Sequence, residues 1–122
     1  MNEATKEFIA ILISHVRDEA IEASDITWRQ LDREHKGFVA KRWEKARQAG
    51  DLDELVRMII ADSVDDAIYS LLHAIDEGIL PLVFKGTNLT EDGGADLAGF
   101  YLCEARYALS KQRTYEEELP GL

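Results

Sequence analysis

Each of two histidines in the chain is followed three residues later by an aspartate. The pairs are His15 with Asp18 and His73 with Asp76. Residues three apart lie on one face of a helix, so each pair can present an imidazole and a carboxylate to one divalent metal ion. Two helices that face each other in a bundle can combine two such pairs. The spacing therefore predicts a candidate metal site at His15, Asp18, His73 and Asp76. The alternative at His15, which adjoins an apolar stripe, is a hydrogen-bonded packing histidine.

A second set of polar residues falls at helical spacing between positions 62 and 77. It comprises Asp62, Asp66, Tyr69, His73 and Glu77. These side chains are expected on one face of a helix whose opposite face carries Val64, Ile68, Leu71 and Ile75. Such a face is either a partner-binding surface or the solvated side of an amphipathic helix. Because like charges at this spacing repel each other, the pattern favours a basic neighbour, from this chain or from a partner.

Carboxylates also occur in pairs three residues apart, as Glu19 with Glu22 and as Asp62 with Asp65. Carboxylate oxygens are the ligands that Mg²⁺ prefers. The two pairs resemble the Glu-x-x-Glu and Glu-x-x-Asp pairs with which all-helical nucleotide pyrophosphohydrolases of the MazG type hold magnesium. The resemblance covers these two spacings only. Asp62 stands where that family has Glu, and the gap between the pairs is longer than usual there. It implies a divalent-metal-dependent hydrolase as the enzymatic alternative.

Charge is segregated along the chain. Residues 28–49 hold seven Lys or Arg against three acids, whereas residues 51–77 hold eight acids against Arg57 alone. The whole chain has a formal net charge of −10 and a pI near 4.7, which argues against general nucleic-acid binding, because phosphate contacts need clustered positive charge. Trp28 and Trp43 lie within the basic segment, and we interpret them as core residues rather than as stacking platforms for bases.

The basic and acidic segments meet at Gly50, which is a natural helix stop. We therefore expect two helices that pack antiparallel and neutralise each other. The expected ion pairs join one of Arg42, Lys45 and Arg47 to one of Asp51, Asp53 and Glu54.

The single cysteine, Cys103, excludes an internal disulfide and a zinc site built from several cysteines. It lies on the apolar side of a predicted helix, so we expect a buried, inert thiol. The first residues show neither the basic nor the apolar region of a signal peptide. The longest apolar runs, such as 8–13 and 79–84, are too short to cross a bilayer. These features predict a cytoplasmic protein without a membrane segment.

Apolar spacings of three and four residues predict the helices. They are expected over residues 3–23, 25–35, 38–49, 52–77 and 95–113. The alternative for the second and third is one bent helix, and the fourth is either one long helix or two. Asp51, with Glu54 three residues later, predicts a helix N-terminus.

The apolar run at residues 79–84 differs from the helices, because it is short, partly β-branched and bounded by glycines. It predicts a strand that Pro81 confines to an edge, pairing as a hairpin with residues 87–90. The acidic end at 114–122 is expected to be at best partly ordered, as a flexible tail.

Together these features predict a mainly α single domain over residues 1–122. It is a bundle of four to five helices with a small β-hairpin or short strand near 79–90. The first helix, the last helix and residues 52–77 are expected to form the core.

We expect a non-enzymatic, acidic, cytoplasmic protein that binds a protein partner. It compares with antitoxins and immunity proteins in size and charge only. A homodimer is expected to use an exposed helix face or the edge strand at 79–84. No cofactor is expected, apart from the divalent metal that the enzymatic alternative requires.

Overall fold

The computed structural model describes residues 2–90 and 96–108. Its elements are, in order, α1 (Glu3–Ile11), the π-helical segment η1 (Leu12–Arg17), α2 (Asp18–Arg29), α3 (Phe38–Gln48), α4 (Leu52–Asp76), β1 (Val83–Phe84), β2 (Thr87–Asn88), α5 (Leu97–Cys103) and the π-helical segment η2 (Glu104–Ala108). The chain is mainly α with one small antiparallel hairpin, which confirms the predicted fold class. Residues 109–113 of the predicted last helix and the predicted tail at 114–122 lie outside the described residues.

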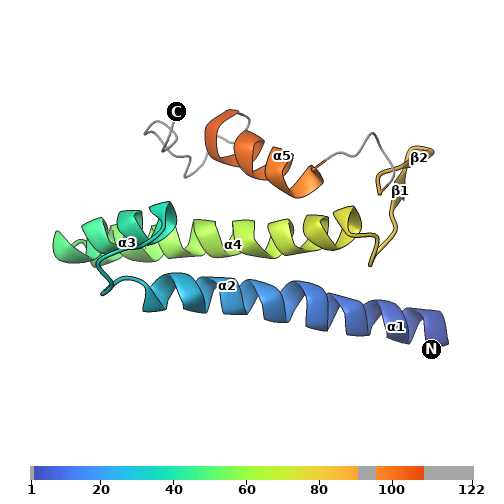
Figure 1. Ribbon diagram of the computed structural model, residues 1–122, viewed down its shortest axis with the longest axis horizontal. Coiled ribbons are helices and arrows are strands. Elements are labelled where there is room, and N and C mark those ends of the chain that lie inside the picture. Colours follow the sequence, from blue (N-terminus) through green and yellow to red (C-terminus); the bar gives the residue numbers. More distant parts are fainter. Residues whose placement is uncertain (1, 91–95, 109–122) are drawn as a thin grey trace.

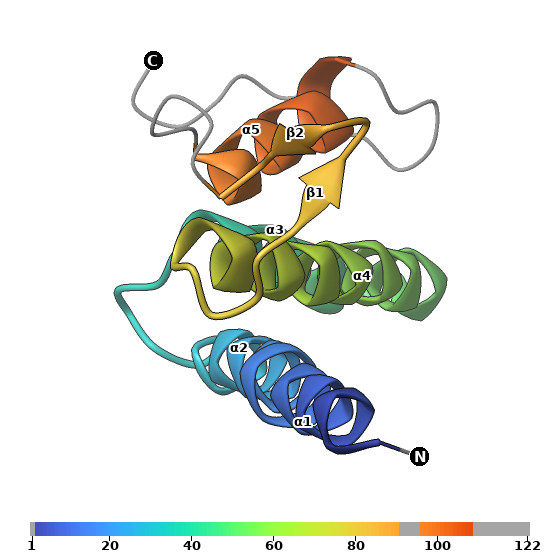
Figure 2. The same ribbon diagram turned by 90° about the vertical axis from the view of Figure 1, so that its right-hand side faces the viewer.

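The helices stack in three layers around α4 (Figures 1 and 2). The continuous helix α1–η1–α2 forms the lowest layer in Figure 1, α4 with α3 beside it forms the middle layer, and α5 forms the top layer. α4 contacts η1, α2, α3 and α5. In the part of the chain that the structure describes, no helix is long and apolar enough to cross a membrane.

The first helix is longer than predicted and contains a π-helical segment. Leu12, Val16, Ala20 and Ser24 follow at intervals of four residues and line one groove against α4. Four residues of a regular α-helix turn by about 400°, so such a row would drift by about 40° at each step. The wider π-helical turn of η1 reduces this drift and keeps the row directed at α4.

The predicted helix boundary at Ser24 and Asp25 is wrong, because α2 continues to Arg29. Ser24 does not cap a helix. Its hydroxyl donates to Asp66 Oδ2 at 3.0 Å and lies 3.1 Å from Ser63 Oγ. The Ser24 hydroxyl therefore contacts a distant helix instead of capping its own backbone.

α4 begins at the predicted residue, ends one residue earlier than predicted, and is one helix of 25 residues. Asp51 caps its start, since Oδ1 accepts the backbone N–H of Glu54 at 3.0 Å. Gly50 and Gly78, with φ of +73° and +74°, end α3 and α4 in the left-handed conformation that glycine adopts without strain.

The hairpin is confirmed but is shorter than predicted. Val83 pairs with Asn88 and Phe84 with Thr87, across a turn in which Lys85 and Gly86 have φ of 50° and 78°. Two positive φ values are the mark of a type I′ hairpin turn. The preceding residues are not in the strand, because the N–H groups of residues 79 and 80 donate to the carbonyl of Ala74 at the end of α4.

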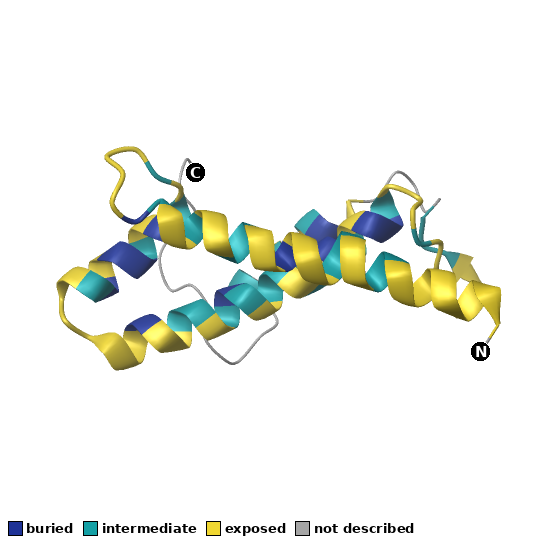
Figure 3. Ribbon diagram, turned by 90° about the horizontal axis from the view of Figure 1, so that it is seen from below, coloured by how far each residue is buried: buried dark blue, intermediate teal, exposed yellow. Residues whose placement is uncertain are grey.

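The main core lies at one end of α4 and not where it was predicted. It contains Leu31, Ala40, Trp43, Ala46 and Leu55, so α3, the turn after α2 and the start of α4 supply it. A second buried group contains Ala74, Ile75 and Ala98. α1 contributes no buried residue, as its predominantly exposed ribbon in Figure 3 shows. The prediction that the first helix forms core is therefore wrong for α1, against which no other described helix except η1 packs, whereas Ala20 of α2, within the same predicted helix, is buried.

Candidate functional site

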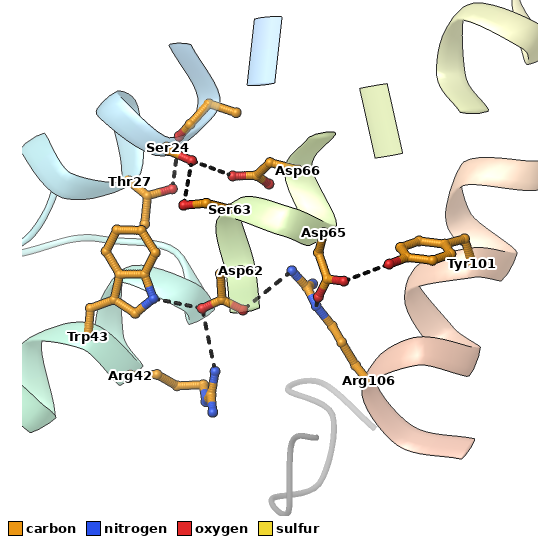
Figure 4. Close-up of polar contacts among 11 residues, drawn as sticks. Ser24, Thr27, Arg42, Trp43, Asp62, Ser63, Asp65, Asp66, Tyr101 and Arg106 are labelled. Atoms are coloured by element: carbon orange, nitrogen blue, oxygen red, sulfur yellow. Dashed lines mark hydrogen bonds and ion pairs between the residues drawn. The ribbon is translucent and has the colours of Figure 1, made fainter. Parts of the chain in front are cut away.

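Three aspartates on consecutive turns of α4 connect four helical segments (Figure 4). They are Asp62, Asp65 and Asp66. Asp62 is only 2% exposed, and its Oδ2 accepts the indole N–H of Trp43 at 2.7 Å. Arg42 Nη1 lies 3.7 Å from the same oxygen, and Arg106 Nη2 lies 3.9 Å from Oδ1. Two guanidinium groups and an indole therefore compensate the burial of this carboxylate.

Asp65 extends the network to the top layer. Its Oδ1 accepts the hydroxyl proton of Tyr101 at 2.9 Å, and its Oδ2 lies 3.3 Å from Nε of Arg106. Burial, together with the hydrogen bond to Asp65, raises the pKa of Tyr101 to about 12. Tyr101 therefore remains a protonated donor at neutral pH, which suits a structural contact rather than proton transfer.

Asp66 connects the network to the lowest layer through Ser24. Burial raises the pKa of Asp66, and the neighbouring Asp62 and Asp65 act in the same direction. The hydrogen bond from Ser24 and the charge of Arg106 oppose this shift.

The predicted partner-binding stripe is therefore not one surface. Asp62 is buried and Asp66 is partly buried. The last three members remain accessible: Tyr69 stacks on His73 with ring centroids 5.9 Å apart, and His73 Nε2 lies 3.6 Å from a carboxylate oxygen of Glu77. Both interpretations of the stripe place all of it on the surface of α4, but α3 and η2 cover its first part.

The residues of the predicted metal site are engaged separately. His15 Nδ1 lies 3.7 Å from Glu19, and Asp18 pairs with Arg17 at 3.1 Å. Asp76 accepts the backbone N–H groups of Leu97 and Ala98 at the start of α5. Within residues 2–90 and 96–108, no three His, Cys, Asp or Glu side chains form a group that could hold a metal ion. The geometry thus adds no support to the metal prediction.

The two carboxylate pairs of the enzymatic alternative also have other partners. Glu22 pairs with Arg29 at 3.3 Å, while Asp62 and Asp65 contact groups of α3, α5 and η2. The α4 side chains that hydrogen-bond to α2 are Ser63 and Asp66. The structure therefore does not direct Asp62 and Asp65 toward Glu19 and Glu22.

The basic helix α3 and the acidic helix α4 interact through Arg42, one of the predicted cations, whose partner Asp62 is not among the predicted acids. Arg42 pairs with buried Asp62, whereas Arg47 forms 2.6 Å ion pairs with Asp32 and Glu44. The first turn of α4 uses Asp51 as the cap, and Asp53 pairs with Arg57 at 3.4 Å.

Cys103 is exposed, so the prediction of a buried thiol is wrong. Tyr101, two residues earlier, faces α4 through Asp65. Residues two apart on a helix do not share a face, and Cys103 therefore lies away from this contact.

The second feature of note is an apolar surface on the lower and middle layers. More large apolar side chains are exposed than buried among the described residues: sixteen are exposed, whereas five of the nine buried hydrophobic residues are alanine. Eight of the sixteen form what we call the open face: Ile9, Ile13, Ile21 and Trp28 of α1–η1–α2, and Leu52, Val56, Ile60 and Val64 of α4. Trp28 is 48% exposed and Trp43 is 1% exposed, so the core prediction is confirmed for Trp43 only.

The open face lies on the side of α4 that α3 does not cover. Ile60 and Val64 stand two residues on either side of Asp62, which faces α3 through Trp43. Positions two apart point to nearly opposite sides of a helix, and both side chains are 53% exposed. The sequence did contain a signal, because the α4 members recur every four residues from Leu52 to Val64, but periodicity alone does not show whether such a row is covered.

A groove of about 630 Å³ runs between the two rows of the open face. Its lining is mostly apolar and consists of Leu12, Val16, Arg17, Ala20, Ile21, Ser24, Asp25, Ser63 and Ala67. Ile60 and Val64 are one helical turn from Ser63 and Ala67, and Trp28 is one turn beyond Ser24. The groove and both rows are therefore parts of one surface.

Comparison of the chain with protein-family models found no match, and comparisons with curated proteins and with solved structures found none either. The functional argument therefore depends on the geometry of the open face and of the aspartate network.

Proposed function

We propose that this is a non-enzymatic, acidic, cytoplasmic protein that binds a protein partner through the open face. The observation that carries the proposal is the exposure of eight large apolar side chains around one apolar groove. Contiguous exposed apolar patches on proteins mark interaction sites far more often than chance. The partner presents an apolar helical surface that fits the two rows, as helix-in-groove recognition requires. The likeness to antitoxins and immunity proteins remains one of size and charge.

The free energy available at the open face is of the same size as the cost of association. Full burial of one large aliphatic side chain contributes about 1.5–3 kcal/mol, so eight half-exposed side chains leave roughly 6–12 kcal/mol unused. Association costs about 4–15 kcal/mol in lost freedom. The two ranges overlap, which is the situation expected of a surface that binds a partner.

The contacts that the ionisable side chains make within the chain favour a binding protein over an enzyme. The three aspartates of α4, of which Asp62 is buried, contact arginine, tryptophan, tyrosine and serine side chains of four other segments, α2, α3, α5 and η2. A catalytic carboxylate needs instead to reach a substrate in a cleft. The network holds α4 in place between its neighbours and so orients the open face.

The test compares two valine-to-glutamate variants of the full chain in its cells of origin. Val64→Glu changes the open face, whereas Val83→Glu is a matched control in the hairpin, 64% exposed. Tagged and untagged chains are expressed together, and all co-purifying proteins are quantified, including the untagged chain. We expect Val64→Glu to lower the recovered partner at least about tenfold, since a buried unpaired charge costs several kcal/mol. Val83→Glu should leave the recovery unchanged.

Equal recovery with wild type and both variants would contradict the proposal. Thermal unfolding of both variants serves as a folding control. Because both valines are exposed in the described structure, the melting temperatures should match that of the wild type at protein concentrations too low for association.

A further inference from the structure

We propose that the partner on the open face is a second copy of this chain, related by a twofold axis at Ile21. This inference depends on the proposed function, because it names the occupant of the same surface. It follows from the charges beside the groove, the exposed apolar rows and the area that they supply.

The groove wall on α2 is self-complementary. Arg17 and Asp25 line the groove four residues before and four residues after Ile21. A twofold axis at Ile21 places two α2 helices antiparallel, so that the residue numbers of facing positions sum to about 42. Arg17 then faces Asp25 of the partner subunit, and Asp25 faces the partner's Arg17. A contact of this kind is isologous, with each ion pair formed twice.

Both charged side chains are available for this contact. Arg17 is 68% exposed in its side chain and pairs with the adjacent Asp18 at 3.1 Å. Such a pair between exposed neighbours contributes little, so Arg17 can exchange it for a partner. Asp25 is exposed, and in the described part of the chain its carboxylate has no hydrogen bond or ion pair.

The apolar residues fit the same register. Ile21, 46% exposed, meets its own copy at the axis. Trp28 comes beside the region of Ile13 and Ser14 of the partner subunit, which buries two of the most exposed side chains of the first row. Ala67 lines the groove together with Ile21, and its small side chain allows the two α4 helices to approach closely.

The area also agrees with a stable dimer. Eight half-exposed apolar side chains supply on the order of 500 Å² of apolar surface per copy. Apolar atoms make up about 60% of typical interfaces, so the whole contact corresponds to about 800 Å² per copy. This equals the contribution of each partner to a standard stable interface.

The first experiment measures the mass of the full chain by sedimentation equilibrium at protein concentrations from about 1 to about 100 µM. The salt concentration is about 0.15 M, because the Debye length of about 8 Å then limits the repulsion between the two acidic chains. We expect a mass twice the 13.8 kDa of one chain. The melting temperature should rise with concentration for the wild type and should not for Ile21→Glu, because only an associating protein shows this linkage. A chain that stays monomeric at the highest concentration overturns the inference.

The second experiment tests the register with charge reversals. Arg17→Glu and Asp25→Lys should each weaken the dimer at least about tenfold, and the double variant should recover to within about threefold of the wild type. Asp25→Lys changes the net charge from −10 to −8 (−10 + 2), which by itself lowers repulsion, so its weakening identifies the local ion pair. Lys41→Glu, exposed on α3, is the matched control for Arg17→Glu and should leave the dimer unchanged.

Failure of the double variant to recover, or single variants that dimerise like the wild type, would overturn the Ile21-centred dimer. The wild-type chain could instead be monomeric and co-purify with a different protein that Val64→Glu no longer recovers. That result would refute the second copy as the occupant and leave the proposed function standing. A monomer without any recovered partner would refute both.

Discussion

At the scale of single residues, Asp62 shows how a charged side chain becomes part of the interior. Its carboxylate receives the indole N–H of Trp43 and the charges of Arg42 and Arg106, so the cost of burial is offset by donors from two other segments. Replacing Trp43 with Phe removes a donor while the carboxylate stays buried. We expect a loss of about 2–3 kcal/mol in the free energy of unfolding, measured by urea denaturation.

Trp28→Phe is the matched control for this change. Trp28 is half exposed in the single chain, and at a protein concentration at which the chain is monomeric we expect a change within about 0.5 kcal/mol. Equal losses in the two variants would contradict the role assigned to the Trp43–Asp62 contact.

Asp66 predicts a pH dependence of stability. Burial raises the pKa of its carboxyl above the ordinary value of 3.8, so the folded chain binds this proton more tightly than the unfolded chain. The stabilising contribution is therefore full below the unfolded pKa and is lost as pH rises through the folded pKa. Asp66→Asn should raise the melting temperature at pH 7, and the gain should vanish below about pH 3.8. Glu34→Gln, exposed in the turn after α2, controls for net charge, and an equal gain there would contradict the argument.

At the scale of elements, α5 contains a glycine, Gly99, whose backbone N–H binds the side chain that caps the start of the helix. Asp96 Oδ1 accepts the N–H of Gly99 at 2.9 Å, and a Cβ added to Gly99 would lie 2.2 Å from Asp96 Oδ2. The cap itself therefore requires the glycine. Gly99→Ala should therefore destabilise the chain by about 1 kcal/mol in urea denaturation, although alanine is ordinarily the better helix former.

A double-mutant cycle separates the two effects at Gly99. In the background of Asp96→Ala the cap is already absent, so Gly99→Ala should become neutral or stabilising. Destabilisation of the same size in both backgrounds would show that packing, and not the cap, requires the glycine.

At the scale of the whole molecule, three layers leave α4 with neighbours on three sides and none of the described elements on the fourth. The aspartate network fixes α2, α3 and α5 around α4, and the fourth side carries the α4 row of the open face. One copy of the chain thus has a small core at each end of α4 and an uncovered apolar surface along its side. The proposed twofold dimer would complete this arrangement as a bundle of paired helices.

Local features of the structure were predictable from the sequence. The cap at Asp51, the stops at Gly50 and Gly78 and the turn at Gly86 depend on neighbouring residues only, and the first two lie where they were predicted. The helical spacing likewise identified α4 as a helix. These features are determined by backbone sterics and hydrogen bonds within a few residues.

Which side of α4 is buried and which is exposed was decided only by the tertiary structure. Periodicity assigned Asp62 to water and Val64 to the core, and the structure shows the reverse. α4 lies between three neighbours and carries apolar residues on more than one side, so its pattern alone does not identify the covered side. Asp62 is buried because Trp43 and Arg106 arrive from distant parts of the chain and compensate its charge, and Val64 stays exposed because no described element covers it.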